Sequence, residues 1–216
     1  MSKNDRPLSC IDCGACACDG KKGAFPDFCL TKEIERSADL GAMEAEVRSR
    51  YLQDPEDHRV AFASAKVEYE HYCSMTRVEE IGEFARQIGA KRLGVATCVG
   101  LISEARTAAK IFRHQGFEVF GVACKIGAVP KESIGLDPAF SRVGPNICNP
   151  ILQAEILNEK ETDLNIVIGL CVGHDSLFYK YSDALCTTLV TKDRVLCHNP
   201  AAALYQTESY YSRLLR

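Results

Sequence analysis

The sequence predicts an α/β fold: a mainly parallel, doubly wound (Rossmann-like) sheet, preceded by an N-terminal Cys-rich metal-binding segment and a helical pair. Three observations predict it. From residue 76 onward, short apolar runs alternate with segments of helical length, which is typical of parallel strands joined by crossover helices. Residues 32–73 repeat apolar side chains at helical spacing. Residues 1–31 carry five cysteines and almost no apolar periodicity, so they cannot build a core alone and a bound metal is expected to supply the missing folding energy.

These observations divide the chain into a Cys-rich segment at 1–31, a helical pair at 32–73 that packs on the core, and an α/β domain at 74–216. Within the pair, Asp54-Pro55 breaks the helical pattern, because the residue before a proline avoids the helical conformation. A second helix is therefore expected from about residue 56 to 72.

The α/β domain opens with a capping box at Thr76 and Glu79, a signature of a helix start. Strands are expected at 91–97, 117–123, 163–170, 186–191 and 194–197. Helices are expected at 101–115, from 149 to about 160, at 174–181 and after Asn199-Pro200. Asn149-Pro150 is an N-cap followed by proline in the first helical turn. A long loop covers 124–148.

Four cysteines lie where such a fold places its ligands. Cys98, Cys124 and Cys171 follow the expected strands, and Cys148 precedes the helix opened by Asn149-Pro150. The carboxyl ends of parallel strands meet at one edge of the sheet, where ligands bind. One buried cysteine is an ordinary small apolar residue, but four at one edge predict a cofactor or metal site.

Four thiolates suit either zinc or an iron–sulfur cluster. Structural zinc usually uses short paired spacings, whereas the gaps here are 26, 24 and 23 residues. The spacing therefore favours a cluster of the 4Fe–4S type, with zinc as the alternative. A second metal site is expected at Cys10, Cys13, Cys18 and Cys29, whose close spacing fits zinc or a second cluster.

Three polar residues are candidates for catalysis at the same edge. His174 and Asp175 follow Cys171, and Lys125 follows Cys124. His174 fits an acid, a base or an alternative ligand, and Asp175 fits a helix cap equally well. His198 is expected to reach the crevice from another strand end. Cys186 and Cys197 are interpreted as packing residues.

Composition excludes some partners. The net charge of −3 gives no electrostatic reason to expect binding to nucleic acid or to a membrane surface. No apolar run has the length of a membrane span, and residues 1–7 have no apolar signal core, so a cytoplasmic protein is expected. The expected partners are metal ions, with a redox partner or a small-molecule substrate. The oligomeric state stays open.

The chain resembles an uncharacterised Cys-rich family of predicted metal-binding proteins, a domain-of-unknown-function family found mostly in anaerobes. The resemblance is carried by the segments 76–81, 94–101, 124–127, 148–150, 169–178, 192–196 and 198–200. Cys10, Cys13, Cys18 and Cys29 also match the family's cysteine pattern, whereas Cys16, Cys186 and Cys197 depart from it. The resemblance implies metal binding but no reaction.

Three functions are therefore open. The first is a cytoplasmic metal-binding protein that carries an iron–sulfur cluster and acts in redox chemistry, electron transfer or metal handling. The second is a cluster-dependent enzyme of the reductase or dehydratase type, in which the cluster keeps one position open for substrate. The third is an interaction module whose fold is stapled by zinc. Whether the protein is an enzyme is not decided by the sequence.

Overall fold

The computed structural model describes residues 9–20 and 23–216, so most of the Cys-rich segment is covered and residues 1–8 and 21–22 are not. The chain forms two compact units, Met1–Phe62 and Ala63–Arg216. The boundary falls inside helix α3 (Pro55–His71). Within the described residues, no helix combines the length and the apolar character that crossing a membrane requires.

The first unit is helical. Two short 3-10 helices, Cys10–Asp12 and Ala17–Asp19, precede α1 (Leu30–Arg36) and α2 (Ala38–Gln53). Ser37 ends α1, and its hydroxyl accepts a hydrogen bond from the Leu40 amide at 3.3 Å, which caps α2. The helical pair expected at 32–73 is therefore a set of three helices, because the cap at Ser37 separates α1 from α2.

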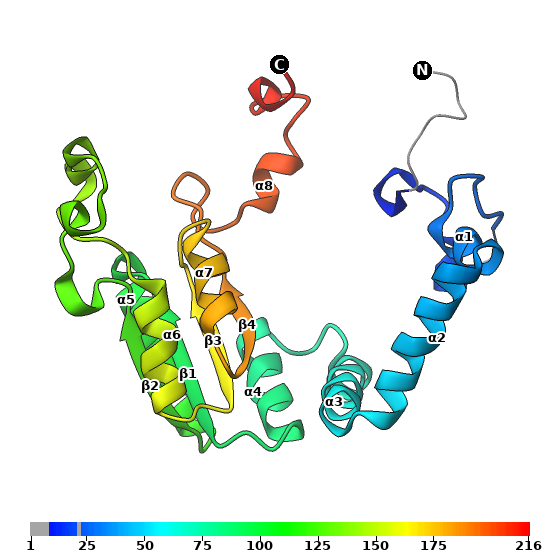
Figure 1. Ribbon diagram of the computed structural model, residues 1–216, viewed down its shortest axis with the longest axis horizontal. Coiled ribbons are helices and arrows are strands. Elements are labelled where there is room, and N and C mark those ends of the chain that lie inside the picture. The colour runs from blue at the N-terminus through cyan, green and yellow to red at the C-terminus, as the bar shows by residue number, and fades with distance from the viewer. Residues whose placement is uncertain (1–8, 21–22) are drawn as a thin grey trace. The chain divides into compact units, whose positions relative to one another are not determined.

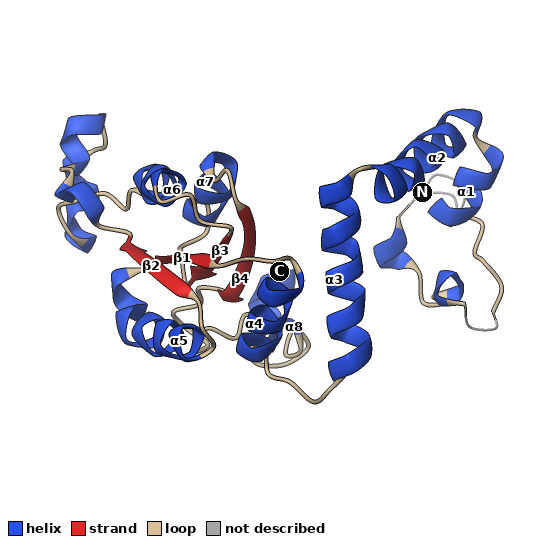
Figure 2. Ribbon diagram, turned by 90° about the horizontal axis from the view of Figure 1, so that it is seen from below, coloured by secondary structure: helices blue, strands red, loops and turns tan. Residues whose placement is uncertain are grey.

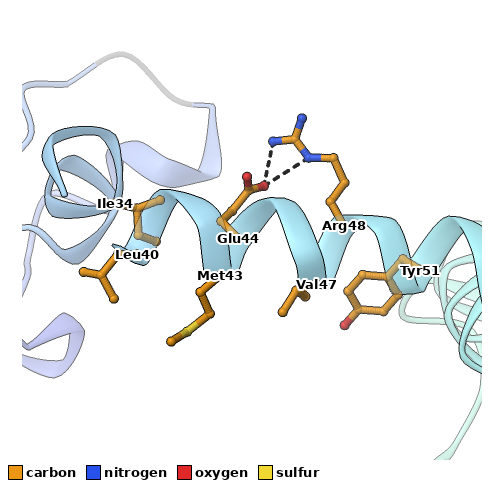
Figure 3. A pocket seen from close by; sticks show the side chains of 7 residues that line it. All are labelled: Ile34, Leu40, Met43, Glu44, Val47, Arg48 and Tyr51. Atoms are coloured by element: carbon orange, nitrogen blue, oxygen red, sulfur yellow. Dashed lines mark hydrogen bonds and ion pairs between the residues drawn. The ribbon is translucent and has the colours of Figure 1, made fainter. Parts of the chain in front are cut away.

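An apolar groove runs along α2. Met43, Val47 and Tyr51 project from one side of the helix, and the ion pair between Glu44 and Arg48 lies on the other side in this view, with N and O 2.6 Å apart (Figure 3). The apolar side chains recur at the three- and four-residue intervals that align side chains on one helix face. This spacing is the pattern that predicted a helix for the segment.

The second unit contains a four-stranded sheet of β1 (Arg92–Thr97), β2 (Glu118–Ala123), β3 (Leu164–Ile168) and β4 (Leu185–Val190). The spatial order is β2-β1-β3-β4 and every pairing is parallel (Figure 1). The two central strands are almost wholly buried, and β3 is buried along its entire length. The α/β class and the parallel sheet are thus confirmed.

Helices cover both faces of this sheet. On one face lie α4 (Arg77–Gln87) and α5 (Ile102–His114), and on the other α6 (Pro150–Glu159) and α7 (His174–Tyr181) (Figure 2). Phe112, Leu157 and Phe178 are fully buried. Helices on both faces leave the strand ends as the open edge at which loops can present functional side chains.

Two local signals in the sequence act as expected. The Thr76 amide donates to the Glu79 carboxylate at 2.8 Å, as in a capping box. The Asn149 side chain accepts from the Leu152 amide at 3.2 Å, which caps α6 ahead of Pro150.

The expected strand at 194–197 is wrong. Asp193 accepts hydrogen bonds from the amides of Val195 and Leu196, both at 2.8 Å. These bonds wind the segment into a turn, because an aspartate side chain competes with strand pairing for nearby amides. The expected terminal helix is short, α8 (Ala201–Leu204). The long loop holds three 3-10 helices, Ile126–Ala128, Lys131–Ile134 and Pro138–Val143.

Gly94 in β1 occupies a position with no space for a side chain. A Cβ there would collide with Asn165 Oδ1 and lie 2.9 Å from Leu157 Cδ1. We expect Gly94→Ala to lower the free energy of unfolding by about 1–3 kcal/mol in urea denaturation. A Cβ added at Gly121 in β2 would meet no atom within 4 Å beyond its chain neighbours, so Gly121→Ala is the control and should retain wild-type stability. Equal losses in both variants would contradict this account of the core.

Candidate functional site

Cysteines occupy the carboxyl edge of the sheet. Cys98 directly follows β1, Cys124 directly follows β2, and Cys171 follows the end of β3. Cys148 lies just before α6, and the next amide, that of Asn149, donates to the Cys124 carbonyl at 2.7 Å. Backbone hydrogen bonds thus tie the Cys148 segment to the strand ends.

Three of the thiols and one imidazole form a continuous chain of contacts. The Cys124 side chain lies near enough to those of Cys98 and Cys148 to shift their pKa values, and Cys148 lies near enough to His174, at the start of α7, to do the same. Cys98 is 8% exposed and Cys124 is 2% exposed. The structure therefore brings together three of the four cysteines of the predicted quartet, with His174 as their neighbour.

Hydrogen bonding favours a thiolate at Cys98. The Cys124 thiol lowers the pKa of Cys98 to about 5, with further contributions from the Gly100 amide and from Lys192. The Gly100 nitrogen and Lys192 Nζ each lie 3.5 Å from Cys98 Sγ. Both are donors, and a thiolate is a better acceptor than a thiol, so these contacts stabilise the charged form.

The surroundings of Cys148 also favour its thiolate form. The Cys124 thiol, followed by His174, lowers the pKa of Cys148 to about 3. The same contact raises the pKa of His174. The pKa of Cys124 itself is raised, because its interactions with Cys148 and with Cys98 favour the protonated thiol and because it is buried. A thiol carries one proton, so Cys124 donates to only one of its two neighbours at a time.

Cys171 lies at the same edge but has a different partner. Its Sγ is 2.9 Å from Nη2 of Arg194, in the turn that follows β4. In the part of the chain that the structure describes, no group of three or more His, Cys, Asp or Glu side chains is arranged so that it could hold a metal ion. The metal site at Cys98, Cys124, Cys148 and Cys171 stays a prediction.

The three catalytic candidates differ in their surroundings. Lys125 Nζ donates to the Asn146 carbonyl at 2.7 Å, and its charge acts on Cys148 and His174. Asp175 accepts from the Ser176 amide at 2.8 Å, within the first turn of α7. Only His174 directly contacts one of the thiols.

His198 closes a turn in this structure. Its Nδ1 accepts a hydrogen bond from the Asp193 amide at 3.1 Å. Cys186 is half-buried in β4, and burial raises its pKa, as expected of a packing residue. Cys197 is exposed and has a φ of 50°, so its interpretation as a packing residue is wrong.

The N-terminal cysteines lie in the first unit. Cys10, Cys16 and Cys18 are exposed, and Cys13 and Cys29 are half-buried, all as free thiols. Cys10 and Cys13 bracket one 3-10 turn, in which the Cys13 amide donates to the Cys10 carbonyl at 3.1 Å. This turn keeps two thiols close in the chain. The second metal site at Cys10, Cys13, Cys18 and Cys29 also stays a prediction.

Sequence reasoning missed three residues near the thiols. Lys192 and Arg194 contact Cys98 and Cys171, and Gln153 of α6 bonds to the ends of two strands. Lys192 and Arg194 follow β4, so the position after a strand end, which selected the cysteines, could have selected these two cations as well. Gln153 carries no such signal, because a glutamine inside a helix is usually exposed.

Comparison with known proteins gives a family without an assigned role. A family model described as a protein of unknown function, DUF1847, matches residues 35–189. An uncharacterised protein of Methanocaldococcus jannaschii is 47% identical over 160 residues, which cover 74% of this chain and 82% of the relative. The segment matched by the family model contains all four cysteines of the sheet edge. The expected resemblance to a domain-of-unknown-function family is confirmed, and its metal binding stays a prediction.

Proposed function

Because the chain belongs to the DUF1847 family, whose function is unknown, we propose from its own chemistry that it binds a thiophilic metal or an iron–sulfur cluster at the sheet edge. Its role would be redox chemistry, electron transfer or metal handling. The observation that supports this proposal is the chain of contacts from Cys98 through Cys124 to Cys148. Three thiols in contact, two of them with lowered pKa, are a donor set suited to soft metals.

Cys98, Cys124 and Cys148 would supply three ligands, and Cys171 the fourth. For this, the Cys171 side chain would have to leave Arg194 and adopt another rotamer. His174 is the alternative fourth ligand, since it already contacts Cys148. A bound cluster would supply one-electron chemistry. Lys192, Lys125 and Arg194 would offset the negative charge of the thiolates. Cys10, Cys13, Cys18 and Cys29 would hold a second metal ion or cluster.

A second candidate function is an enzyme. It is favoured by the contact between Cys148 and His174, because a thiolate beside an imidazole is the arrangement of an activated nucleophile. In a cluster-dependent reductase or dehydratase, His174 would instead move protons at a substrate bound beside the cluster. An activated Cys148 nucleophile would need no metal, whereas a cluster-dependent enzyme would need the cluster, so composition analysis separates the nucleophile from both cluster-bearing functions.

The test is the iron, zinc and acid-labile sulfide content of protein purified without oxygen. We expect about four irons and four sulfides per cluster, and loss of this content in Cys98→Ser. Cys186→Ser is the matched control, because it removes a half-buried thiol of β4 outside the contact chain and should retain the metal. Zinc without sulfide would exclude the cluster. Protein that neither retains nor takes up metal would refute the proposal.

A further inference from the structure

Gln153 is a buried amide inside the second unit. It lies on α6 and is 0% exposed, yet its Oε1 has no hydrogen-bond partner. Its Nε2 donates to the Val122 carbonyl at 2.7 Å and to the Thr97 carbonyl at 3.2 Å. Burying an unpaired amide carbonyl costs free energy. An apolar side chain at this position would avoid that cost, but it could not make the two hydrogen bonds that the amide nitrogen donates.

These two carbonyls belong to the strand ends that carry the thiols. Thr97 directly precedes Cys98, and Val122 lies two residues before Cys124. Gln153 itself is five residues beyond Cys148 on the helix that this cysteine precedes. One side chain therefore joins the three backbone segments from which the contacting thiols arise.

The need for such a link follows from the topology. β2 lies at the edge of the sheet, and its one partner strand within residues 9–20 and 23–216 is β1. Beyond the last ladder position, at Thr97 and Ala123, the Cys124 amide donates to the Thr97 carbonyl at 2.8 Å, and the chains then enter a 3-10 helix and a long loop. The Thr97 carbonyl at the end of the ladder therefore accepts from both the Cys124 amide and Gln153, directly before Cys98.

We propose that Gln153 is a positioning residue that fixes the spacing of the Cys98, Cys124 and Cys148 thiols for a metal. This inference rests on the proposed function, and it adds a residue that acts through the ligands without being one. Residues that orient metal ligands through hydrogen bonds typically contribute about 10- to 100-fold to affinity.

The test is titration of the metal-free protein with Cd²⁺, followed by thiolate-to-metal charge-transfer absorption. We expect Gln153→Met, which keeps the length of the side chain but removes the amide, to weaken Cd²⁺ binding about 10- to 100-fold. Gln115→Met is the matched control, because Gln115 also has a buried, unpartnered Oε1 but lies at the end of α5. The control should bind as the wild type does. Wild-type affinity in Gln153→Met would overturn the inference.

A metal-independent readout separates this inference from the proposed function. Phenylarsine oxide bridges neighbouring thiols, and we expect Gln153→Met to slow bridging at least tenfold relative to Gln115→Met. If wild-type protein binds no Cd²⁺, the proposed function fails, and an unchanged bridging rate then overturns the positioning role as well. If Gln153→Met does not fold, Gln153→Asn serves in its place, because its amide is too short to reach both carbonyls. Gln153→Asn is expected to weaken Cd²⁺ binding and to slow bridging as Gln153→Met does.

Discussion

Replacing Cys124 with alanine is expected to abolish metal binding at the sheet edge and to raise the pKa values of Cys98 and Cys148. Cys124 lies between Cys98 and Cys148. The interaction with Cys124 is the largest cause of the lowered pKa of Cys98 and of Cys148. Without it, the thiols lose their common neighbour and their strongest hydrogen bond, so the site loses one ligand and most of its thiolate character.

The measurement has two parts. Cd²⁺ or iron stoichiometry on anaerobic protein should fall from the wild-type value to background at this site. The pH dependence of alkylation, followed cysteine by cysteine with mass spectrometry, should shift toward the ordinary thiol pKa of about 8.5. Cys186→Ala provides the control, because it also truncates a cysteine in the second unit but breaks no thiol contact. If Cys124→Ala keeps its full metal content, the three-thiol site is wrong.

The fold was predictable because its elements carry local signals. Asn149-Pro150 and the Thr76–Glu79 box mark helix starts by hydrogen bonds that span three residues, and the apolar runs of β1 and β3 match burial on both faces. The turn at 193–198 was mispredicted, because Val195 and Leu196 are typical strand residues while the Asp193 side chain takes their amides. Short polar side chains that compete for the backbone act at single positions, which a periodic pattern does not reveal.

The site was predictable in topology but not in detail. Parallel strands place Cys98, Cys124 and Cys171 at one edge of the sheet whatever rotamers their side chains adopt. The sequence therefore suffices to select these residues, because ligands bind at the carboxyl ends of parallel strands. It does not determine which thiols touch. That depends on rotamers and on cations such as Arg194, which holds Cys171, and Lys192, which faces Cys98. Gln153 was beyond sequence reasoning, because its burial is a property of tertiary packing alone.

The alkylation rate of Cys148 in metal-free protein is expected to be nearly independent of pH between about 5 and 8. Its pKa of about 3 means that the thiolate persists as pH falls and is lost only when the pH approaches that value. A cysteine in an unstructured peptide, with a thiol pKa of about 8.5, loses about tenfold in rate per pH unit below it. The shape of the pH profile, not the absolute rate, reports the lowered pKa of Cys148. A thiolate of low pKa is also a weaker nucleophile, so its absolute alkylation rate can be low at every pH.

His174→Gln tests the origin of this profile. His174 is the second largest cause of the lowered pKa of Cys148, after Cys124. Removing the imidazole should move the acidic limb of the Cys148 profile to higher pH. The Cys98 profile should keep its shape, because His174 is not among the causes of the lowered pKa of Cys98.

The raised pKa of His174 predicts a further feature in the wild type. The imidazolium persists above pH 6.5 and is lost as pH rises through its raised value, which ends the thiolate–imidazolium pair. A wild-type Cys148 profile that follows the unstructured peptide would contradict this electrostatic account, and with it the enzyme candidate that depends on an activated Cys148.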